Sequence, residues 1–350
     1  MWGHKKDCSL PHKSNLDLKK IPDFLQNNSN MLDVITIGSA TRDVFLVSDK
    51  FIALKSPKFE TGVGECLNLG AKIELDDLVL TTGGGATNAA ITFASLGFST
   101  ATICPVGDDA PGRDIKETLK IAGVQTKFMK IHDSGKTGYS TILTMKTGER
   151  TVLVHRGVSA TFSSKDIPWK KLKAKWIYLT SLGGNITLAK EIILHAQKNK
   201  IKIAWNPGSK ELEIGLAVFQ KILPFVDVFN LNKEEAELLT RTKKIKNMLK
   251  LLQREEKITV ITDGTKGAYA QIDGMIIHVG TRPVKVISQT GAGDAFGSGL
   301  VASLLHGENI QTALAIGVLN AESVIQSYGA KNGILTKWPS KQQIQKIPKK

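Results

Sequence analysis

The chain has 350 residues, of which 41% are hydrophobic, so it can bury the core of one large α/β domain or two ordinary ones and is not globally disordered. Its net charge is +15, but the 47 basic residues are dispersed and no nucleic-acid-binding motif accompanies them, which argues against a nucleic-acid partner and favours anionic small molecules. Cys8, Cys66 and Cys104 form no C-x-x-C pair, so we expect neither disulfides nor a zinc site, and a cytoplasmic location.

The first thirty residues are polar and lack the apolar core of a signal peptide. We expect residues 1–30 to be a disordered extension, and we treat Met31, which directly precedes the first predicted strand, as a candidate for the true start of the protein. Residues 34–37 form a short apolar run that ends at Gly38, which is typical of a buried parallel strand. Asp43 follows soon after this strand.

Residues 44–80 alternate around several glycines, which predicts a small β-element that leaves the main sheet and returns, in the manner of a lid. Three glycines at 83–85 then lead into a helix that ends near Gly97, and they allow the backbone to approach a neighbour closely. Asn88, in the first turn of this helix, is either an ordinary cap or a ligand for a hydroxyl-rich molecule. The uncharged run 86–107 contains too many polar residues for a membrane span, so we expect no membrane partner.

The middle of the chain alternates short apolar segments with longer helical ones. Because such alternation builds a parallel sheet with helices on both faces, we expect an α/β fold with a mostly parallel central sheet. Two of the strands form a hairpin that extends the lid. The predicted helices cover 111–122 and 186–198, and the predicted strands cover 100–106, 138–145, 151–155, 176–179, 201–205, 226–230 and 258–262.

The most informative stretch lies near the C-terminal end. Residues 284–289 are β-branched and alternating, which predicts a strand, and the Gly-Ala-Gly turn at 291–293 predicts entry into a helix that ends near residue 305. The first amides of a helix have no intrahelical partner, and with the helix dipole they bind anions. Asp294 stands at the mouth of this anion site, where it is either a cap or a base that takes a proton from an attacking hydroxyl.

A further helix is predicted over 310–326, and a lysine-rich segment follows it. We interpret residues 337–350 as a basic tail, either a solvated face or a loose end of the chain. Residues 31–336 then form the main domain.

The two glycine-rich motifs stand far apart in the chain, and together they resemble the two signatures of the PfkB, or ribokinase-like, family of carbohydrate and nucleoside kinases. The resemblance runs over roughly residues 31–335 and follows the order of the family's motifs throughout. The matching residues are Gly83, Gly84 and Asn88 in the first signature, Gly291-Ala292-Gly293-Asp294 before Ala295-Phe296 in the second, and the supporting pairs Gly38 with Asp43, Asn232 with Glu235, Thr262 with Gly264 and Gly267, and Asn320.

This resemblance implies a three-layer α/β/α ribokinase-like fold with a small β-lid within about 44–80 and 138–156. It implies an ATP-dependent phosphotransferase, a carbohydrate kinase that moves the γ-phosphate of MgATP to a hydroxyl of a sugar or sugar-like substrate. Mg²⁺ prefers few protein oxygens together with phosphate and water, which fits a distant Asn and Glu.

The resemblance also assigns roles to individual residues. Taken alone, Asn232 and Glu235 predict a capping box at the start of a helix, and Asp43 an ordinary loop carboxylate. The implied roles are Asp294 as catalytic base; Gly291, Ala292 and Gly293 as anion hole; Asp43, Gly83, Gly84 and Asn88 as substrate ligands; Asn232, Thr262, Gly264, Gly267 and Asn320 around the nucleotide; and Glu235, with Asn232, organising Mg²⁺ through water.

The chain departs from the ribokinase pattern at Ser288. Many ribokinase-like enzymes carry an Asp at this place, shortly before the catalytic Asp, whereas this chain has Ser288-Gln289-Thr290. The missing carboxylate predicts weak or no activation by K⁺.

Other classes of protein share parts of this sequence pattern. Gly291, Gly293 and Gly297 approach a Rossmann dehydrogenase fingerprint, but that fingerprint normally follows the first strand of the domain. The G-x-x-x-x-G-K-[ST] motif of a P-loop kinase is absent. A nucleoside kinase of the adenosine type and a non-catalytic sugar-binding relative stay open, since residues 139–156 do not identify the substrate. The resemblance allows either a monomer or a lid-mediated homodimer.

Overall fold

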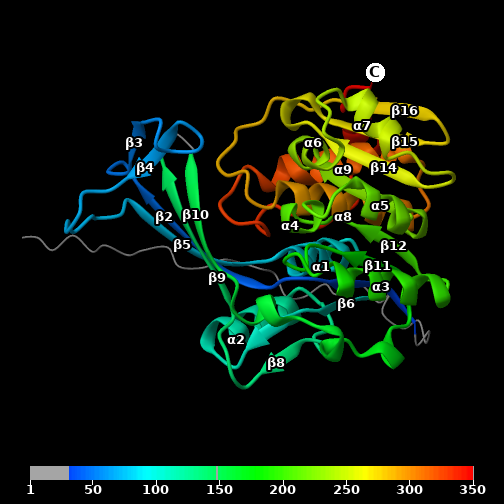
Figure 1. Ribbon diagram of the computed structural model, residues 1–350, viewed down its shortest axis with the longest axis horizontal. Helices are drawn as coiled ribbons and strands as arrows, with labels where there is room; N and C mark the ends of the chain where they lie inside the picture. Colours follow the sequence, from blue (N-terminus) through cyan, green and yellow to red (C-terminus); the bar gives the residue numbers. More distant parts are fainter. Residues whose placement is uncertain (1–30, 147–148, 350) are drawn as a thin grey trace, which may run out of the picture. The chain divides into compact units, whose positions relative to one another are not determined.

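A computed structural model describes residues 31–146 and 149–349 of the chain, so the predicted extension at residues 1–30 lies outside the described residues. An eight-stranded sheet forms the centre of this part, with the strand order β16-β15-β14-β13-β12-β11-β1-β6 (Figure 1). The neighbours from β14 to β6 pair in parallel, whereas β15 pairs antiparallel with both β14 and β16, which confirms a mostly parallel sheet. Their bounds are β1 Leu32–Ile37, β6 Thr100–Ile103, β11 Ala174–Leu179, β12 Lys202–Trp205, β13 Val228–Asn232, β14 Ile258–Thr262, β15 Ala268–Ile272 and β16 Met275–Val279.

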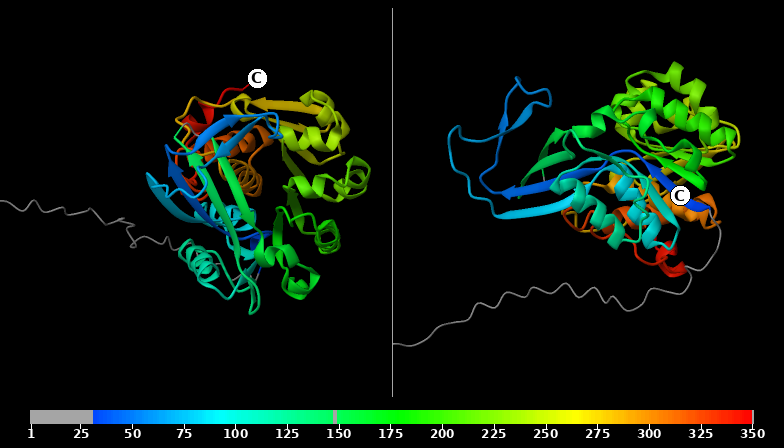
Figure 2. Two further views of the ribbon diagram at one scale, coloured as in Figure 1. Left: turned by 60° about the vertical axis from the view of Figure 1, so that its left-hand side comes forward. Right: turned by 90° about the horizontal axis from the view of Figure 1, so that it is seen from below.

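Helices cover both faces of this sheet because alternate strand residues enter two different cores. In β1, Val34 packs into one hydrophobic cluster, whereas Ile35 and Ile37 pack into another. The right-hand view of Figure 2 shows the yellow-green and the orange helices on opposite sides of the sheet, which confirms the three-layer α/β/α arrangement. One layer holds α3 (Ile186–Lys198), α5 (Leu216–Ile222), α6 (Lys233–Thr240) and α7 (Ile245–Leu251), and the other holds α1 (Gly85–Ser95), α8 (Ala292–Leu305), α9 (Ile310–Val324) and α10 (Lys341–Gln345). Two further helices are α2 (Ala110–Ile121) and α4 (Ser209–Leu212).

The strand order reverses beside β1. The chain places β6 on one side of β1 and later returns to place β11 on its other side. Open α/β sheets bind ligands outside the carboxyl ends of the strands at such a reversal. The residues that follow β1 and β11, beginning at Gly38 and Thr180, therefore border the expected ligand crevice.

A second, four-stranded sheet projects from the central sheet as the predicted lid (Figure 1). Its order is β10-β9-β2-β5, and a two-stranded ribbon of β3 and β4 extends it. The bounds are β2 Thr41–Ser48, β3 Ile52–Lys55, β4 Val63–Cys66, β5 Asp77–Gly83, β9 Gly138–Met145 and β10 Arg150–His155. None of the helices that the structure describes is long and apolar enough to cross a membrane.

The strand predicted over 284–289 is wrong. This segment pairs with no described strand, and its amides at Ile287 and Ser288 donate instead to the carbonyl oxygen of Ile325, at 2.8 and 3.2 Å, just past the end of α9. An alternating pattern describes a surface that packs well in a sheet, and it forms a strand only where a partner lies alongside. The stretch is thus a loop that leads into α8.

Two other boundaries differ from the prediction. The predicted strand 100–106 breaks at Cys104, and β7 (Pro105–Gly107) pairs with β8 (Lys130–His132) outside the central sheet, where a proline without an N–H is tolerated. The strand predicted over 226–230 is shifted to β13, whose last residue, Asn232, also caps α6.

The basic tail is not a loose end. Within it, α10 begins with a capping box at Ser340, and Ile347 is 1% exposed in the cluster that also contains α9. The carbonyl oxygen of Pro348 accepts a 2.7 Å hydrogen bond from the amide of Gly280. The apolar residues of the tail, which stand between lysines in the sequence, thus attach the tail to the core.

Candidate active site

The turn before α8 requires glycine at one position and leaves open space at another. Gly291 has φ 82°, and a Cβ added there would lie 2.3 Å from the Cβ of Ala330. Gly293, in the first turn of the helix, has no heavy atom within 4 Å of the place where a Cβ would stand. Its N–H finds no acceptor among the residues that the structure describes, whereas the amide of Ala292 bonds Gln289 at 3.3 Å. The turn therefore presents an unpaired donor at a positive helix end, as an anion site requires.

Asp294 lies in the first turn of α8 and is joined to the other glycine motif. The side-chain amide of Asn88 donates a hydrogen bond of 2.8 Å to Oδ2 of Asp294, across 206 residues of sequence. Burial raises the pKa of Asp294 above its usual range, and the nearby charge of Asp43 acts in the same direction. The hydrogen bond from Asn88 and the positive charge of Lys331 act against this rise. The carboxylate thus binds a side chain of α1 instead of simply capping its own helix.

Asn88 is 4% exposed, and of the two polar atoms of its side chain only Nδ2 has a hydrogen-bond partner in the described protein. Its Oδ1 is buried and has no donor in the part of the chain that the structure describes. Leaving a buried acceptor unpaired costs about 1–3 kcal/mol. A hydroxyl that donates to Oδ1 beside Asp294 would remove this cost, which suits the predicted contact with a substrate.

Glycines allow Asp43 and the start of α1 to pack closely. A Cβ added at Gly83 would lie 1.9 Å from Oδ2 of Asp43, and one added at Gly84, where φ is 96°, would lie 2.4 Å from the carbonyl oxygen of Ser39. Thr41 donates a 2.9 Å hydrogen bond to the other oxygen of Asp43. Only residues without a side chain at 83 and 84 let the lid strand and the helix meet in this way.

Lys331 is a site residue that sequence reasoning missed. Its Nζ donates to the carbonyl oxygen of Thr82 at 2.6 Å and to the hydroxyl of Thr87 at 2.9 Å. Burial lowers the pKa of Lys331 to about 7, although the charges of Asp43 and Asp294 both favour its protonated form. The structure thus places one ammonium group near two carboxylates, and no pattern in the sequence distinguishes this lysine from its many neighbours.

Asn232, Thr262 and Glu235 meet where β13 and β14 end. Asn232 and Thr262 are direct partners in the parallel ladder. Asn232 and Glu235 form the predicted capping box, in which each side chain accepts from the other's amide, at 2.8 and 2.9 Å. The loop after β14 turns through Gly264 and Gly267, which have φ 49° and 93°. These residues form one corner of the carboxyl edge of the sheet.

The surroundings of Glu235 fit a cation. Burial, together with the negative charge of Asp294, raises the pKa of Glu235 to about 7, so both carboxylates influence the same region. Within the described residues there is no group of three or more His, Cys, Asp and Glu side chains that could hold a metal ion. One nearby carboxylate with water and phosphate oxygens is the kind of ligand set that Mg²⁺ accepts.

Asn320 is placed differently from the other predicted nucleotide ligands. It is 0% exposed, and its amide donates to the carbonyl oxygen of Ala295 at 2.8 Å while its Oδ1 accepts from the amide of Leu335 at 2.9 Å. No polar atom is left for a nucleotide, so the predicted direct contact has no support in this structure. The residue instead ties α9 to the first turn of α8, next to Asp294.

Comparisons with known proteins find similar sequences and a similar fold. The family model described as pfkB family carbohydrate kinase matches residues 31–337. An uncharacterized sugar kinase of Archaeoglobus fulgidus is 30% identical over 68% of this chain and 96% of its own, and ribokinase of Mus musculus is 27% identical over 79% and 83%. The crystal structure of adenosine kinase from Sinorhizobium meliloti has a TM-score of 0.72 at 24% identity and covers 87% of this chain and 97% of its own, which shows a shared fold.

Proposed function

Because the chain belongs to the pfkB family of carbohydrate kinases, we propose that it transfers the γ-phosphate of MgATP to a hydroxyl of a sugar or sugar-like acceptor. The observation that carries this proposal is the 2.8 Å hydrogen bond between Asn88 and Asp294, because it joins the two glycine-rich motifs in one site. A nucleoside as acceptor and a non-catalytic sugar-binding protein are the alternatives that the test below separates.

The proposed mechanism assigns the base to Asp294. The acceptor hydroxyl binds against Asn88 and Asp43, and it gives its proton to Asp294 as its oxygen attacks the γ-phosphorus. The bond from phosphorus to the β,γ-bridging oxygen breaks, and ADP leaves. The unpaired N–H of Gly293 stabilises the negative charge on the transferring group. The ammonium group of Lys331 favours the charged form of Asp294 that can accept the proton.

The nucleotide is proposed to bind at the corner formed by β13 and β14, with Asn232, Thr262, Gly264 and Gly267 around it. Glu235 would hold Mg²⁺ through water, and the ion would neutralise phosphate charge when bound. The raised pKa of Glu235 supports this assignment, since a carboxylate in a buried and negatively charged region gains from a nearby cation.

ADP release from MgATP, measured with a panel of sugars and nucleosides, tests the proposal. We expect at least one acceptor to support turnover, and Asp294→Asn to lower kcat by about 10²–10⁴-fold while nucleotide affinity changes little. An unchanged kcat would remove the base assignment. If no acceptor raises ADP release above that of Asp294→Asn, the non-catalytic alternative is favoured.

A further inference from the structure

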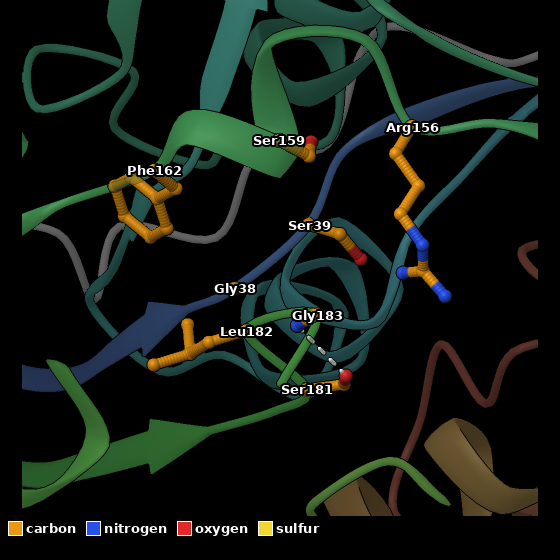
Figure 3. Close-up of a pocket in the computed structure, with 8 residues that line it drawn as sticks. All are labelled: Gly38, Ser39, Arg156, Ser159, Phe162, Ser181, Leu182 and Gly183. Carbon is orange, nitrogen blue, oxygen red and sulfur yellow. Dashed lines mark hydrogen bonds between the residues drawn. The ribbon is translucent and has the colours of Figure 1, made fainter. Parts of the chain in front are cut away.

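A polar hollow lies at the reversal of the strand order, outside the carboxyl ends of β1 and β11 (Figure 3). Open α/β sheets bind ligands at this place. The hollow also borders the proposed substrate site, because Ser39 is the residue that the backbone of Gly84 approaches so closely. Its lining residues are Gly38, Ser39, Arg156, Ser159, Phe162, Ser181, Leu182 and Gly183.

The lining offers hydrogen-bond donors and positive charge without any acidic side chain. Figure 3 shows the guanidinium group of Arg156 and the hydroxyls of Ser39 and Ser181 around the same opening. Nη1 of Arg156 lies 3.6 Å from where a Cβ on Gly183 would stand, so a larger residue at 183 would crowd the arginine. The hydroxyl of Ser159 is shielded from solvent and has no partner among the described residues.

Arg156 is available for a ligand. The guanidinium group of Arg156, which directly follows lid strand β10, has no hydrogen bond or ion pair in residues 31–146 or 149–349, and only its main-chain carbonyl oxygen is bonded, by the amide of Ser159. Four other arginines of the chain are engaged with the protein. Arg42 pairs with Asp114, Arg113 with Asp108, and Arg282 with Glu322, and Arg254 donates to main-chain carbonyl oxygens.

A buried carboxylate holds the opposite wall of the hollow in place. Glu211 is 1% exposed, and its oxygens accept from the amides of Leu182, Gly184 and Gly208, at 2.5, 3.1 and 3.0 Å, and from the hydroxyl of Ser181. These bonds occupy both of its oxygens and build a rigid loop after β11. The negative charge of Glu211 is thus committed to the loop, whereas the positive charge of Arg156 is not committed to any group.

We propose that the acceptor of the kinase carries an anionic group, a phosphate or a carboxylate, and that Arg156 binds this group together with Ser39. The inference rests on the proposed function and narrows its substrate class. A guanidinium group presents paired N–H donors that match two oxygens of a phosphate or carboxylate, and the hydroxyl of Ser39 can donate to a further oxygen. The anionic group takes no part in the transfer itself, in which the hydroxyl proton passes to Asp294 and the new O–P bond forms as ADP leaves.

Steady-state kinetics with three sets of acceptors test the inference: neutral sugars and nucleosides, sugar phosphates, and sugar acids. We expect an anionic set to have the highest kcat/KM, and comparing sugar phosphates with sugar acids identifies the anion. Arg156→Gln should raise KM for the preferred anionic acceptor about 10- to 100-fold, as the loss of charged hydrogen bonds does, with a smaller change in kcat. Arg150→Gln, an exposed arginine at the start of the same strand, is the matched control and should behave as wild type.

Two outcomes would overturn the inference. The first is a higher kcat/KM for neutral acceptors than for both anionic sets. The second is an equal change in KM for neutral and anionic acceptors in Arg156→Gln. The proposed function fails separately, when no acceptor supports turnover above that of Asp294→Asn. In that case calorimetric titration of Asp294→Asn with sugar phosphates and sugar acids, with and without Arg156→Gln, still decides whether Arg156 binds an anion.

Discussion

Single residues in this site acquire their chemistry from their surroundings. Asp294, Asp43 and Lys331 come from three distant parts of the chain, and charges interact more strongly in a buried site than at the surface. Burial raises the pKa of Asp294 and lowers the pKa of Lys331 to about 7. The two shifts thus move the pKa values of the carboxyl and ammonium groups toward each other.

Replacing Lys331 should therefore change the pH dependence of the reaction. Asp294 must be deprotonated to accept a proton, so kcat/KM rises with pH through its pKa. Lys331 is protonated below about pH 7, and its charge lowers the pKa of Asp294. Lys331→Met should thus raise that pKa and move the acid limb of the kcat/KM profile to higher pH. Lys337→Met, at an exposed lysine nearby in sequence, serves as control. An acid limb at the wild-type position would show that Lys331 does not act on the base.

Ser288 carries a second prediction at this scale. It is 7% exposed, its amide donates to Ile325, and its hydroxyl accepts from the amide of Thr290 at 3.2 Å. Without a carboxylate at this place, we expect K⁺ to stimulate turnover weakly or not at all. The measurement is ADP release in KCl against tetramethylammonium chloride at constant ionic strength, and a large stimulation by K⁺ would refute the prediction.

At the scale of elements, one glycine at the start of α8 is needed for folding, and another is proposed to serve catalysis. Gly291 has a left-handed backbone and touches Ala330, whereas Gly293 faces open space beside an unpaired N–H. We expect Gly293→Ala to leave the free energy of unfolding unchanged or to raise it by up to about 1 kcal/mol, because alanine favours a helix. Its methyl group would nevertheless stand where the phosphoryl group is proposed to bind and should lower kcat.

Gly291→Ala is the matched variant, and it should lower the free energy of unfolding through backbone strain and collision with Ala330. Urea denaturation and ADP release are measured on both variants. Equal loss of stability in the two, or full activity in Gly293→Ala, would contradict the assignment of Gly293 to the anion hole.

The helices and strands also show which structural features local sequence patterns can predict. Local signals predicted α3 with its observed bounds, the glycine entry into α1 and the capping box of α6, because caps and helical periodicity depend on neighbouring residues. Local signals wrongly predicted a strand over 284–289, because a strand needs a partner from elsewhere in the chain. They also missed the packing of the tail, because Ile347 packs into a core built by other elements.

At the scale of the whole molecule, the proposed site draws on the lid, both helix layers and the sheet edge. Asp43 lies on a lid strand, Asn88 and Asp294 lie on helices of one face, and Glu235 lies on a helix of the other. The lid also exposes large apolar side chains at Leu78, Leu80, Val152, Leu153 and Val154. A monomer or a lid-mediated homodimer stays a prediction, and sedimentation equilibrium distinguishes the two.

Ligands that bind such a site should stabilise the molecule as a unit. We expect MgATP with the preferred acceptor to raise the melting temperature of Asp294→Asn by several degrees, because binding at 100 times Kd adds about 2.7 kcal/mol to the free energy of unfolding. Using this variant slows turnover during the measurement. Differential scanning calorimetry with MgATP alone and acceptor alone provides the controls. A well-folded Asp294→Asn without any shift in melting temperature would show that these ligands do not bind the variant.

The sequence by itself determined the alternation of strands and helices, the glycines that permit close approach, and Asp294 at the start of a helix, because each follows from local geometry. Only the tertiary structure decided which distant groups meet. It brought Asn88 to Asp294 and placed Lys331 beside Thr82 and Thr87. It also engaged the side chain of Asn320 in hydrogen bonds within the protein, and it left the guanidinium group of Arg156 without a partner at the hollow outside the strand ends. Charge, burial and unpaired donors depend on contacts across the chain, and local patterns carry no record of them.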